Sequence, residues 1–151
     1  MVWAKRDAVK KSRLSLSEET ITETILLDLK TQYPGNVKVV AYNKPQEAKT
    51  GADWIWSFVS ADRSRSAAML VQAKRLEDAE LEYPGINRNI GKRVPPVRQI
   101  DQLLDTARRL GIPAVYAFYN HVSNKTRVPK TCGSLKPTDP NQVFGFGISV
   151  A

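Results

Sequence analysis

The residues of this chain best suited to chemistry are Asp53, Gln72 and Lys74. Gln72 and Lys74 end the apolar run 67–74, which has the composition of a buried strand. Side chains alternate between the two faces of a strand, so these two polar groups share a face. A lysine is rarely buried without a partner or a function. If a hairpin joins this strand to one opened by Asp53, the carboxylate, the amide and the lysine form a pocket for a metal ion and a phosphate, as in a nuclease.

The chemistry of such a pocket follows from the preferences of its groups. Mg²⁺ takes oxygen ligands and keeps several waters, so one or two carboxylates suffice, and Mn²⁺ is the alternative ion. We expect Asp53 to be the first ligand, with the side-chain carbonyl of Gln72 and the backbone carbonyl of Ala73 completing the shell. Lys74 would orient or deprotonate the attacking water and offset the charge that develops on the phosphate. The competing interpretation makes Asp53 a strand-entry residue and Lys74 a solvated strand end.

The segment Ser15-Leu16-Ser17-Glu18 predicts a helix start, with a serine N-cap and a glutamate three positions later. Apolar residues follow at helical spacing, at Ile21, Ile25 and Leu29. Glu18 falls on this stripe, so the helix carries a carboxylate inward. We expect Glu18 to hold a ligated water or a second ion, with Glu19 as the alternative. Both acids could instead serve only the positive end of the helix dipole.

The other elements are read from periodicity and breakers. Strand patterns cover 37–42, 53–59, 67–74, 112–119 and 143–150, whereas 77–96 and 120–141 read as irregular. A second helix is predicted over 97–110, with Gly111 as its stop and an inward face of Ile100, Leu103, Leu104 and Ala107. The order is helix, three strands, helix, strand. It predicts an α/β fold with a mixed central sheet flanked by helices, since the helix between the third and fourth strands makes the crossover that parallel pairing requires.

The first helix carries an acid, Asp53 opens a strand, and the next strand contains Leu70-Val71-Gln72-Ala73-Lys74-Arg75. In these features residues 15–120 resemble the PD-(D/E)XK nuclease superfamily. The last stretch is similar to the Mrr-type restriction endonuclease branch, in which glutamine replaces the acid of the motif. The chain departs from the family name in having Gly51-Ala52 rather than proline before Asp53. The resemblance implies a restriction-endonuclease-like core and a metal-dependent endonuclease that hydrolyses phosphodiester bonds, favours DNA, and acts in restriction or anti-phage defence. It also implies that Gln99 faces the site, although Gln99 could instead be an ordinary residue at a helix start. Glu47, six residues before Asp53, is a candidate accessory acid or an acid on the surface of a loop.

Composition bounds these expectations. The chain has 151 residues, 42% of them apolar, which is enough for one domain with a single core; we divide it into a basic arm (1–14), a core (15–120), and an irregular tail with a final strand (121–151). No apolar stretch approaches the roughly 18 residues of a membrane span, and no signal segment is evident. The single cysteine, Cys132, fits a reducing cytoplasm, and with His121 as the only histidine a zinc cluster is excluded.

A net charge of +8 favours a polyanionic partner, which we expect to be nucleic acid. The residues expected to contact phosphates are Lys5, Arg6, Arg88, Lys92, Arg93 and Arg98. Tyr83 is a candidate for base stacking. Two other functions stay open, a catalytically silent module of the same fold that binds nucleic acid or protein, and a structure-specific RNA or junction nuclease. Metal binding separates the first and substrate preference the second. The sequence also leaves open a homodimer and a further domain or partner subunit.

Overall fold

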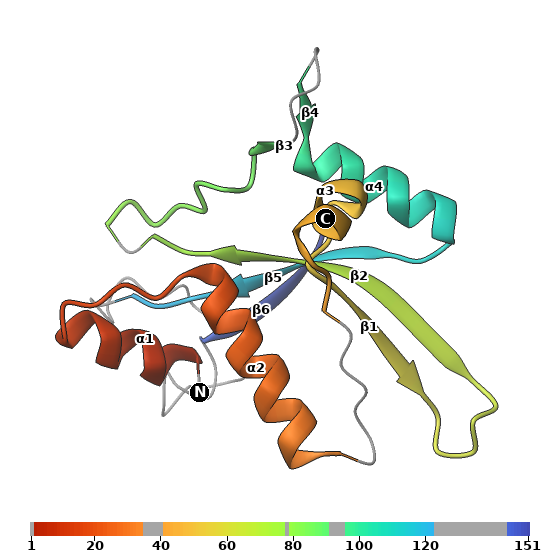
Figure 1. Cartoon of the computed structure of the whole chain (residues 1–151), viewed down its shortest axis with the longest axis horizontal. Helices are drawn as coiled ribbons and strands as arrows, with labels where there is room; N and C mark the ends of the chain where they lie inside the picture. Colours follow the sequence, from red (N-terminus) through yellow and green to blue (C-terminus); the bar gives the residue numbers. More distant parts are fainter. Residues whose placement is uncertain (1, 35–40, 78, 91–95, 123–144) are drawn as a thin grey trace, which may run out of the picture.

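A four-stranded mixed sheet forms the centre of the protein, with helices on both faces (Figure 1). The structure, a computed structural model, describes residues 2–34, 41–77, 79–90, 96–122 and 145–151. The strands are β1 (Trp54–Val59), β2 (Ser66–Arg75), β5 (Ala114–Tyr119) and β6 (Phe146–Val150), and they lie in the order β1-β2-β5-β6. The helices are α1 (Val2–Lys11), α2 (Glu18–Gln32), α3 (Lys44–Thr50) and α4 (Gln99–Leu110). The expected mixed α/β class is therefore confirmed.

Strand pairing follows the predicted pattern. β1 and β2 form an antiparallel hairpin in which Trp54 lies opposite Val71. β2 and β5 are parallel, with Gln72 opposite Tyr116, and α4 supplies the crossover between them. β6 pairs antiparallel with β5 and forms the other end of the sheet order. Both the hairpin and the parallel crossover expected from the order of elements are confirmed.

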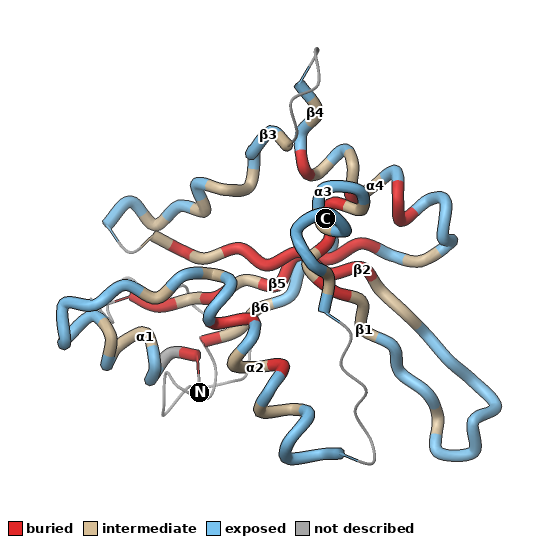
Figure 2. Tube along the Cα trace, viewed as in Figure 1, coloured by how far each residue is buried: buried red, intermediate tan, exposed pale blue. Residues whose placement is uncertain are grey.

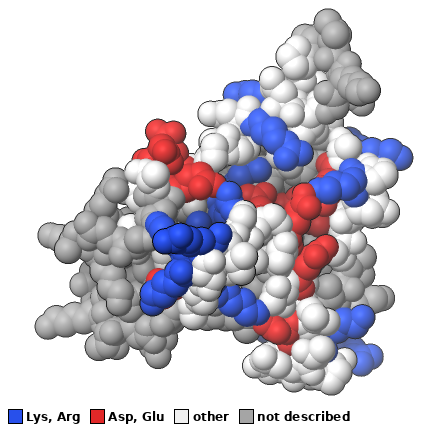
Figure 3. All heavy atoms as spheres, turned by 60° about the vertical axis from the view of Figure 1, so that its left-hand side comes forward, with Lys and Arg blue, Asp and Glu red and all other residues white. Residues whose placement is uncertain are grey.

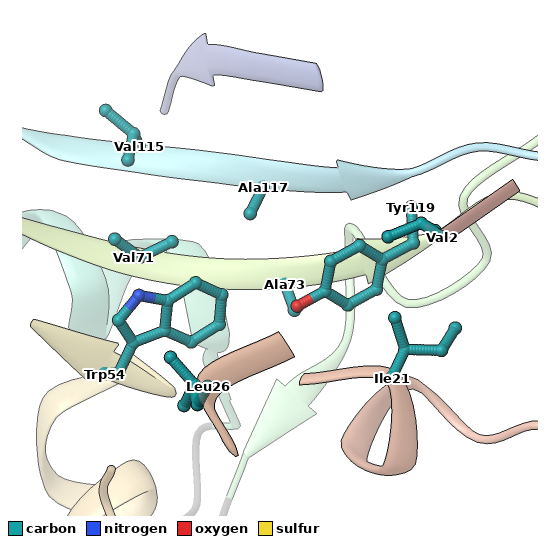
Figure 4. Close-up of a cluster of buried hydrophobic side chains, with 9 residues drawn as sticks. All are labelled: Val2, Ile21, Leu26, Trp54, Val71, Ala73, Val115, Ala117 and Tyr119. Carbon is teal, nitrogen blue, oxygen red and sulfur yellow. The ribbon is translucent and has the colours of Figure 1, made fainter. Parts of the chain in front are cut away.

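The two faces of the sheet bury separate apolar clusters, because successive residues of β2 point to opposite sides. On one face α1 and α2 cover the sheet, and the cluster shown in Figure 4 is Val2, Ile21, Leu26, Trp54, Val71, Ala73, Val115, Ala117 and Tyr119. On the other face α4 packs through Leu103 and Ala107 onto Leu70 and Ala114. Buried segments accordingly concentrate along β2 and β5 in the middle of the sheet (Figure 2). Gln72 and Lys74 lie on the face that α4 covers.

Helix boundaries differ slightly from expectation. α2 begins at Glu18, and its N-cap is Ser17, whose hydroxyl accepts from the backbone N–H of Thr20. The predicted cap at Ser15 is therefore wrong by two positions. Glu18 is the first residue of the helix and its carboxylate accepts from the backbone N–H of Arg75, so it does not form a capping box with Ser15. α4 begins at Gln99, since Val97–Arg98 forms β4, and ends at Gly111 in the left-handed region as predicted.

The basic arm, whose structure the sequence left open, contains the helix α1. Val2 of α1 is buried in the main cluster. Arg6 donates to the backbone carbonyls of Tyr119 (2.6 Å) and Leu76 (2.7 Å) at the end of the sheet. These contacts attach α1 to the core, so its amphipathic pattern serves packing as well as charge.

Several segments between the main elements also differ. Most of the strand expected at 37–42 lies outside the described residues, and Ala41 forms an isolated bridge with Trp54. The region 77–96 contains β3 (Asn89–Ile90), which pairs with β4 (Val97–Arg98), and so is partly ordered. The final strand begins at Phe146 instead of residue 143, and the irregular tail lies mostly outside the described residues. In the part of the chain that the structure describes, no helix is long and apolar enough to cross a membrane.

Candidate metal and phosphate site

The site lies along the end of β2 that extends past its partner strand β1. The backbone N–H and C=O groups of the odd-numbered residues of β2 point toward β1. The carbonyl of Val71, for example, accepts from the backbone N–H of Asp53 (2.9 Å). β1 begins after Asp53, so the next two N–H groups on this edge have no strand partner. Both are satisfied by carboxylates, since Ala73 donates to Asp53 Oδ2 (2.6 Å) and Arg75 donates to Glu18 Oε2 (2.8 Å). Two acids from separate elements are thereby aligned along one strand edge.

The backbone carbonyl of Ala73 belongs to the same edge. In an extended strand the N–H and C=O groups of one residue point to the same side. The Ala73 carbonyl therefore leaves β2 between the N–H groups that hold Asp53 and Glu18. Two carboxylates and one carbonyl supply oxygen donors of the kind that a hard divalent cation prefers.

Burial disfavours the charge on both carboxylates. It raises the pKa of Asp53 to about 7, with a smaller contribution from Glu18 and against the opposing hydrogen bond from Ala73. It also raises the pKa of Glu18, against the charges of Lys74 and Arg75. A cation bound between the acids would offset this cost and lower both pKa values. The electrostatics of the edge thus favour occupation by positive charge.

Lys74 lies behind this pair. Its side chain is 3% exposed, and its ammonium donates to Gln99 Oε1 (3.1 Å). Burial lowers the pKa of Lys74, while the charges of Glu18 and Asp53 act in the opposite direction. Among the described ion pairs none joins Lys74 to either acid. The lysine is coupled to the carboxylates by charge, and Gln99 holds its head.

Gln72 is fully buried, and only the nitrogen of its side-chain amide is hydrogen-bonded. Its Nε2 donates to the carbonyl of Gly51 (2.5 Å), whereas its Oε1 has no hydrogen-bond partner. Gly51 is the left-handed C-cap of α3 and packs so closely on α4 that an added Cβ would lie 2.6 Å from the backbone nitrogen of Leu103. Gln72 therefore braces the turn before Asp53.

Gln99 connects the lysine to the surface of the site. It is buried at the first position of α4, and its backbone N–H donates to the carbonyl of Arg88 (2.8 Å). Its side chain accepts from Lys74 and also lines the cavity in front of the acids. The expectation that Gln99 faces the site agrees with this geometry.

In front of the acids is a cavity of about 300 Å³ between α2 and α3. Its acidic lining residues are Glu18, Glu19, Glu23, Glu47 and Asp53. Its basic lining residues are Lys44 and Arg88. The remaining lining residues are Thr22, Leu26, Ala41, Tyr42, Asn43 and Gln99. Metal-suited oxygens and phosphate-suited cations therefore share one concave surface.

Glu19 and Glu47 occupy the outer part of this cavity. Glu19 is exposed and forms an ion pair with Lys44, so Glu18, and not its alternative Glu19, reaches the strand edge. Glu47 lies 3.7 Å from Lys44 and adds to the negative charge around Asp53. Within the described ranges no group of three or more His, Cys, Asp or Glu residues could hold a metal. The donor set is thus two carboxylates supplemented by carbonyls, which suits an ion that retains several waters.

Sequence reasoning missed α3 and its contribution to the cavity. Asn43 caps this helix with Gln46 in a reciprocal capping box, and Pro45 stands in the first turn. This N-cap, proline and glutamine pattern is a recognised signal for a helix start. Reading it would have predicted a short helix directly before Asp53, although not its position opposite α2.

Three of the four described residues that were expected to contact phosphates have partners within the protein. Lys5 pairs with Asp28, and Arg98 forms a bidentate contact with Asp101. Arg6 bonds to backbone carbonyls, as described above, and Lys92 and Arg93 lie outside the described residues. On the face shown in Figure 3, Lys and Arg occur in several groups with Asp or Glu nearby. Among the expected phosphate contacts, Arg88 is the one that lines the cavity.

Tyr83, the candidate for base stacking, is engaged internally. Its ring lies 4.5 Å from that of Phe118 between centroids, and its hydroxyl donates to Asn120 Oδ1 (2.6 Å). Leu76 and Val122 form the small cluster on which it packs. Tyr83 thus anchors the segment after β2.

The fold and the site define a mixed α/β protein in which two carboxylates lie at one strand edge beside a cavity, with a buried lysine on the adjoining face of the same strand. The chain belongs to the family of unknown function DUF6615, whose model matches residues 1–151. Comparison with curated proteins finds no match.

Proposed function

We propose that this protein is a metal-dependent endonuclease that hydrolyses phosphodiester bonds of nucleic acid, with DNA as the favoured substrate and Mg²⁺ or Mn²⁺ as the ion. The observation that carries the proposal is the alignment of Asp53 and Glu18 along one edge of β2, next to the buried Lys74. The two acids accept from the backbone N–H groups of Ala73 and Arg75, which have no partner in another strand. Groups chosen only for solubility would have no reason to converge on a buried strand edge. Their burial is costly unless a function or a counterion offsets it.

The chain's own groups fit a divalent cation. Asp53, Glu18 and the Ala73 carbonyl would hold it, and the unpaired Oε1 of Gln72 offers a further oxygen. When bound, Mg²⁺ supplies Lewis-acid polarisation and activates water at neutral pH. A glutamine in place of a third carboxylate reduces the charge of the site, so we expect the affinity for the ion to be modest.

The other polar groups have distinct roles in this proposal. Lys74 orients the attacking water and offsets the charge that develops on the phosphate in the transition state. Its lowered pKa also suits it to exchange a proton. Gln99 positions the ammonium before substrate enters.

We also propose that the core is restriction-endonuclease-like. An antiparallel β1–β2 hairpin, a parallel β2–β5 pair and the α4 crossover support this assignment. A role in restriction or anti-phage defence rests on the resemblance of the Gln72-Ala73-Lys74 strand to the Mrr-type branch. We propose a cytoplasmic location, which suits a single cysteine and a nucleic-acid substrate.

A cleavage assay tests the proposal. Plasmid DNA, single-stranded DNA and RNA are incubated with the protein in Mg²⁺, Mn²⁺ or EDTA. We expect cleavage that EDTA abolishes and that Asp53→Asn lowers at least about a hundredfold. Asp105→Asn, which removes an exposed carboxylate on the outer side of α4, is the matched control and should cleave normally. Metal-independent cleavage, or full activity of Asp53→Asn, would contradict the proposed site.

A second candidate is a catalytically silent module that binds nucleic acid through the same cavity. The observation that favours it is the small number of carboxylates at the strand edge, with Gln72 where a third acid could stand. It predicts nucleic-acid binding with no cleavage under any metal condition. Gln72→Glu discriminates further, because added charge should strengthen Mg²⁺ binding if the side chain faces the ion.

A further inference from the structure

The cavity in front of Asp53 has the dimensions of a single small ligand. Its volume of about 300 Å³ is at the lower end of the range for small-molecule pockets. α2 supplies one wall through Glu18 and Thr22, and the segment leading into α3 supplies the other through Tyr42 and Asn43. One nucleotide can enter a space of this size, whereas two paired strands cannot.

The two cations of the cavity come from different elements and lie near each other. Arg88 has no hydrogen-bond or ion-pair partner for its guanidinium within the described part of the chain, and its charge acts on both Lys44 and Glu18. Lys44 is held by Glu19 of α2 and by Glu47 of α3, so this ion pair spans the cavity from helix to helix. Arg88 is therefore available to an anion at the mouth of the cavity, whereas Lys44 can bind one only by exchanging Glu19 for it.

The wall opposite α2 carries an aromatic ring. Tyr42 is half-buried, its backbone N–H donates to the carbonyl of Asp53 (3.0 Å), and it packs against the cluster that contains Ala52 and Leu70. Tyr42 is thereby held directly before Asn43, the N-cap residue of α3, and it lines the same cavity as the acids. Leu26 contributes apolar surface to the same cavity. Tyr42 thus lines the same cavity as Lys44 and Arg88, and proteins that bind unpaired strands combine aromatic rings with basic residues in this way.

We propose that this cavity receives one nucleotide of an unpaired strand, with its phosphate between Lys44 and Arg88 and its base against Tyr42. This inference rests on the proposed function, which it deepens by naming the substrate class as single-stranded nucleic acid or a nucleotide turned out of a duplex. Turning out a paired base requires that its pairing and stacking be broken, so strand ends, flaps and mismatches are preferred over intact duplex. Displacement of Glu19 by the incoming phosphate opens the bridge between α2 and α3.

Binding measured in EDTA tests the inference without relying on catalysis. The full-length protein is titrated into labelled single-stranded DNA, single-stranded RNA and blunt duplex DNA, and fluorescence anisotropy is recorded. We expect single strands to bind at least about tenfold more tightly than the duplex. Lys44→Gln, Arg88→Gln and Tyr42→Ala should each weaken single-strand binding about five- to tenfold, and Tyr42→Phe should retain it. Lys49→Gln removes an exposed charge of α3 outside the cavity lining, so it is the matched control and should bind normally.

The outcomes separate this inference from the nuclease proposal. Equal affinity for duplex and single strands, or unchanged binding by both Lys44→Gln and Tyr42→Ala, overturns the inference. Metal-dependent cleavage of intact duplex at the same rate as single strands overturns it while leaving the nuclease proposal in place. The expected binding pattern without any cleavage supports the inference and overturns the nuclease proposal. Circular dichroism melting of each variant shows that lost binding does not reflect lost folding.

Discussion

Asp53 is the residue whose environment departs furthest from that of an ordinary surface acid. Its carboxylate accepts a backbone hydrogen bond from Ala73 and lies near Glu18, and burial dominates both effects. The pKa of about 7 means that the folded protein without a cation binds a proton there at mildly acidic pH. The group is therefore sensitive to pH and to metal in the range where enzymes work.

This environment predicts how stability depends on pH. The pKa of Asp53 is about 7 in the folded chain against an ordinary value of 3.8, so between these values the native state binds more protons than the unfolded state. The contribution of Asp53 to the free energy of unfolding is then fully present below about pH 4 and is lost as the pH rises through 7, at up to about 1.4 kcal/mol per pH unit. Asp53→Asn cannot ionise and should lack this loss. Urea denaturation in EDTA from pH 5 to pH 8, compared between the two proteins, measures the difference; parallel curves would contradict it.

The same group predicts a response to metal. At pH 8 the ionised Asp53 is unfavourable without a counterion, so Mg²⁺ should raise the melting temperature of the native protein by binding the folded state alone. Asp53→Asn removes a ligand and should show a much smaller rise. Ca²⁺ at the same concentration serves as a comparison ion. If Mg²⁺ stabilises both proteins equally, its binding site lies elsewhere.

Lys74 permits a separation of catalysis from stability. Lys74→Met keeps most of the aliphatic stem and avoids burying a charge, but it leaves Gln99 Oε1 without its donor, so stability should fall by only about 1 to 3 kcal/mol. Cleavage, in contrast, should fall at least about a hundredfold, because the lysine acts on charge in the transition state. Thermal melting and initial cleavage rates are compared with those of Lys49→Gln. Near-normal cleavage by Lys74→Met would leave Lys74 with a structural role only.

At the scale of elements, the position of Asp53 depends on how α3 meets α4. Gly51 ends α3 with φ +73° and carries the carbonyl to which Gln72 donates. An added Cβ would lie 2.6 Å from Leu103 N and 2.8 Å from Gln99 O, which are backbone atoms of α4 and cannot yield cheaply. The turn before the acid is thus set by a close approach of two helices.

This contact predicts different costs for two similar substitutions. Gly51→Ala should destabilise the protein by about 3 kcal/mol or more, because it adds overlap with α4 to the cost of a left-handed backbone. Gly111 has nearly the same φ (+66°) at the end of α4 but nothing within 4 Å of an added Cβ, so Gly111→Ala should cost only about 1 kcal/mol. Urea denaturation gives both values. Equal costs would show that α3 and α4 can separate without penalty.

At the scale of the whole molecule, the charge of +8 is less available to a partner than its size suggests. Lys5, Arg6 and Arg98 are engaged with groups of the protein itself. Basic and acidic side chains also alternate over the face in Figure 3. Electrostatic attraction of nucleic acid therefore depends on the few cations that lack such partners, among which Arg88 lies at the site.

Salt titrations distinguish these two kinds of cation. Each phosphate contact contributes roughly one unit to the slope of log affinity against log salt concentration. Arg88→Gln should reduce the slope by about one, whereas Lys5→Gln, which removes a paired lysine on α1, should leave it unchanged. Binding is measured in EDTA from low to moderate salt. A loss of slope for Lys5→Gln and none for Arg88→Gln would place the binding surface on α1.

Local patterns in the sequence were sufficient for several features of this protein. Alternation along 67–74 predicted that Gln72 and Lys74 share a face, and that holds because a strand has a period of two in any context. The hairpin, the crossover helix with its stop at Gly111, and the inward direction of Glu18 follow equally from short-range spacing. Each of these depends on backbone geometry within one or two elements.

Only the tertiary structure decided which groups meet. Glu18 reaches Arg75 N because β1 begins too late to cover that stretch of β2, and this depends on the register between strands. The internal partners of Lys5, Arg98 and Tyr83 are set by the docking of elements onto one another, which no local period encodes. The cavity likewise exists only because α3 packs opposite α2. Periodicity determines the face on which a side chain lies, whereas distances between remote residues depend on packing of the whole chain.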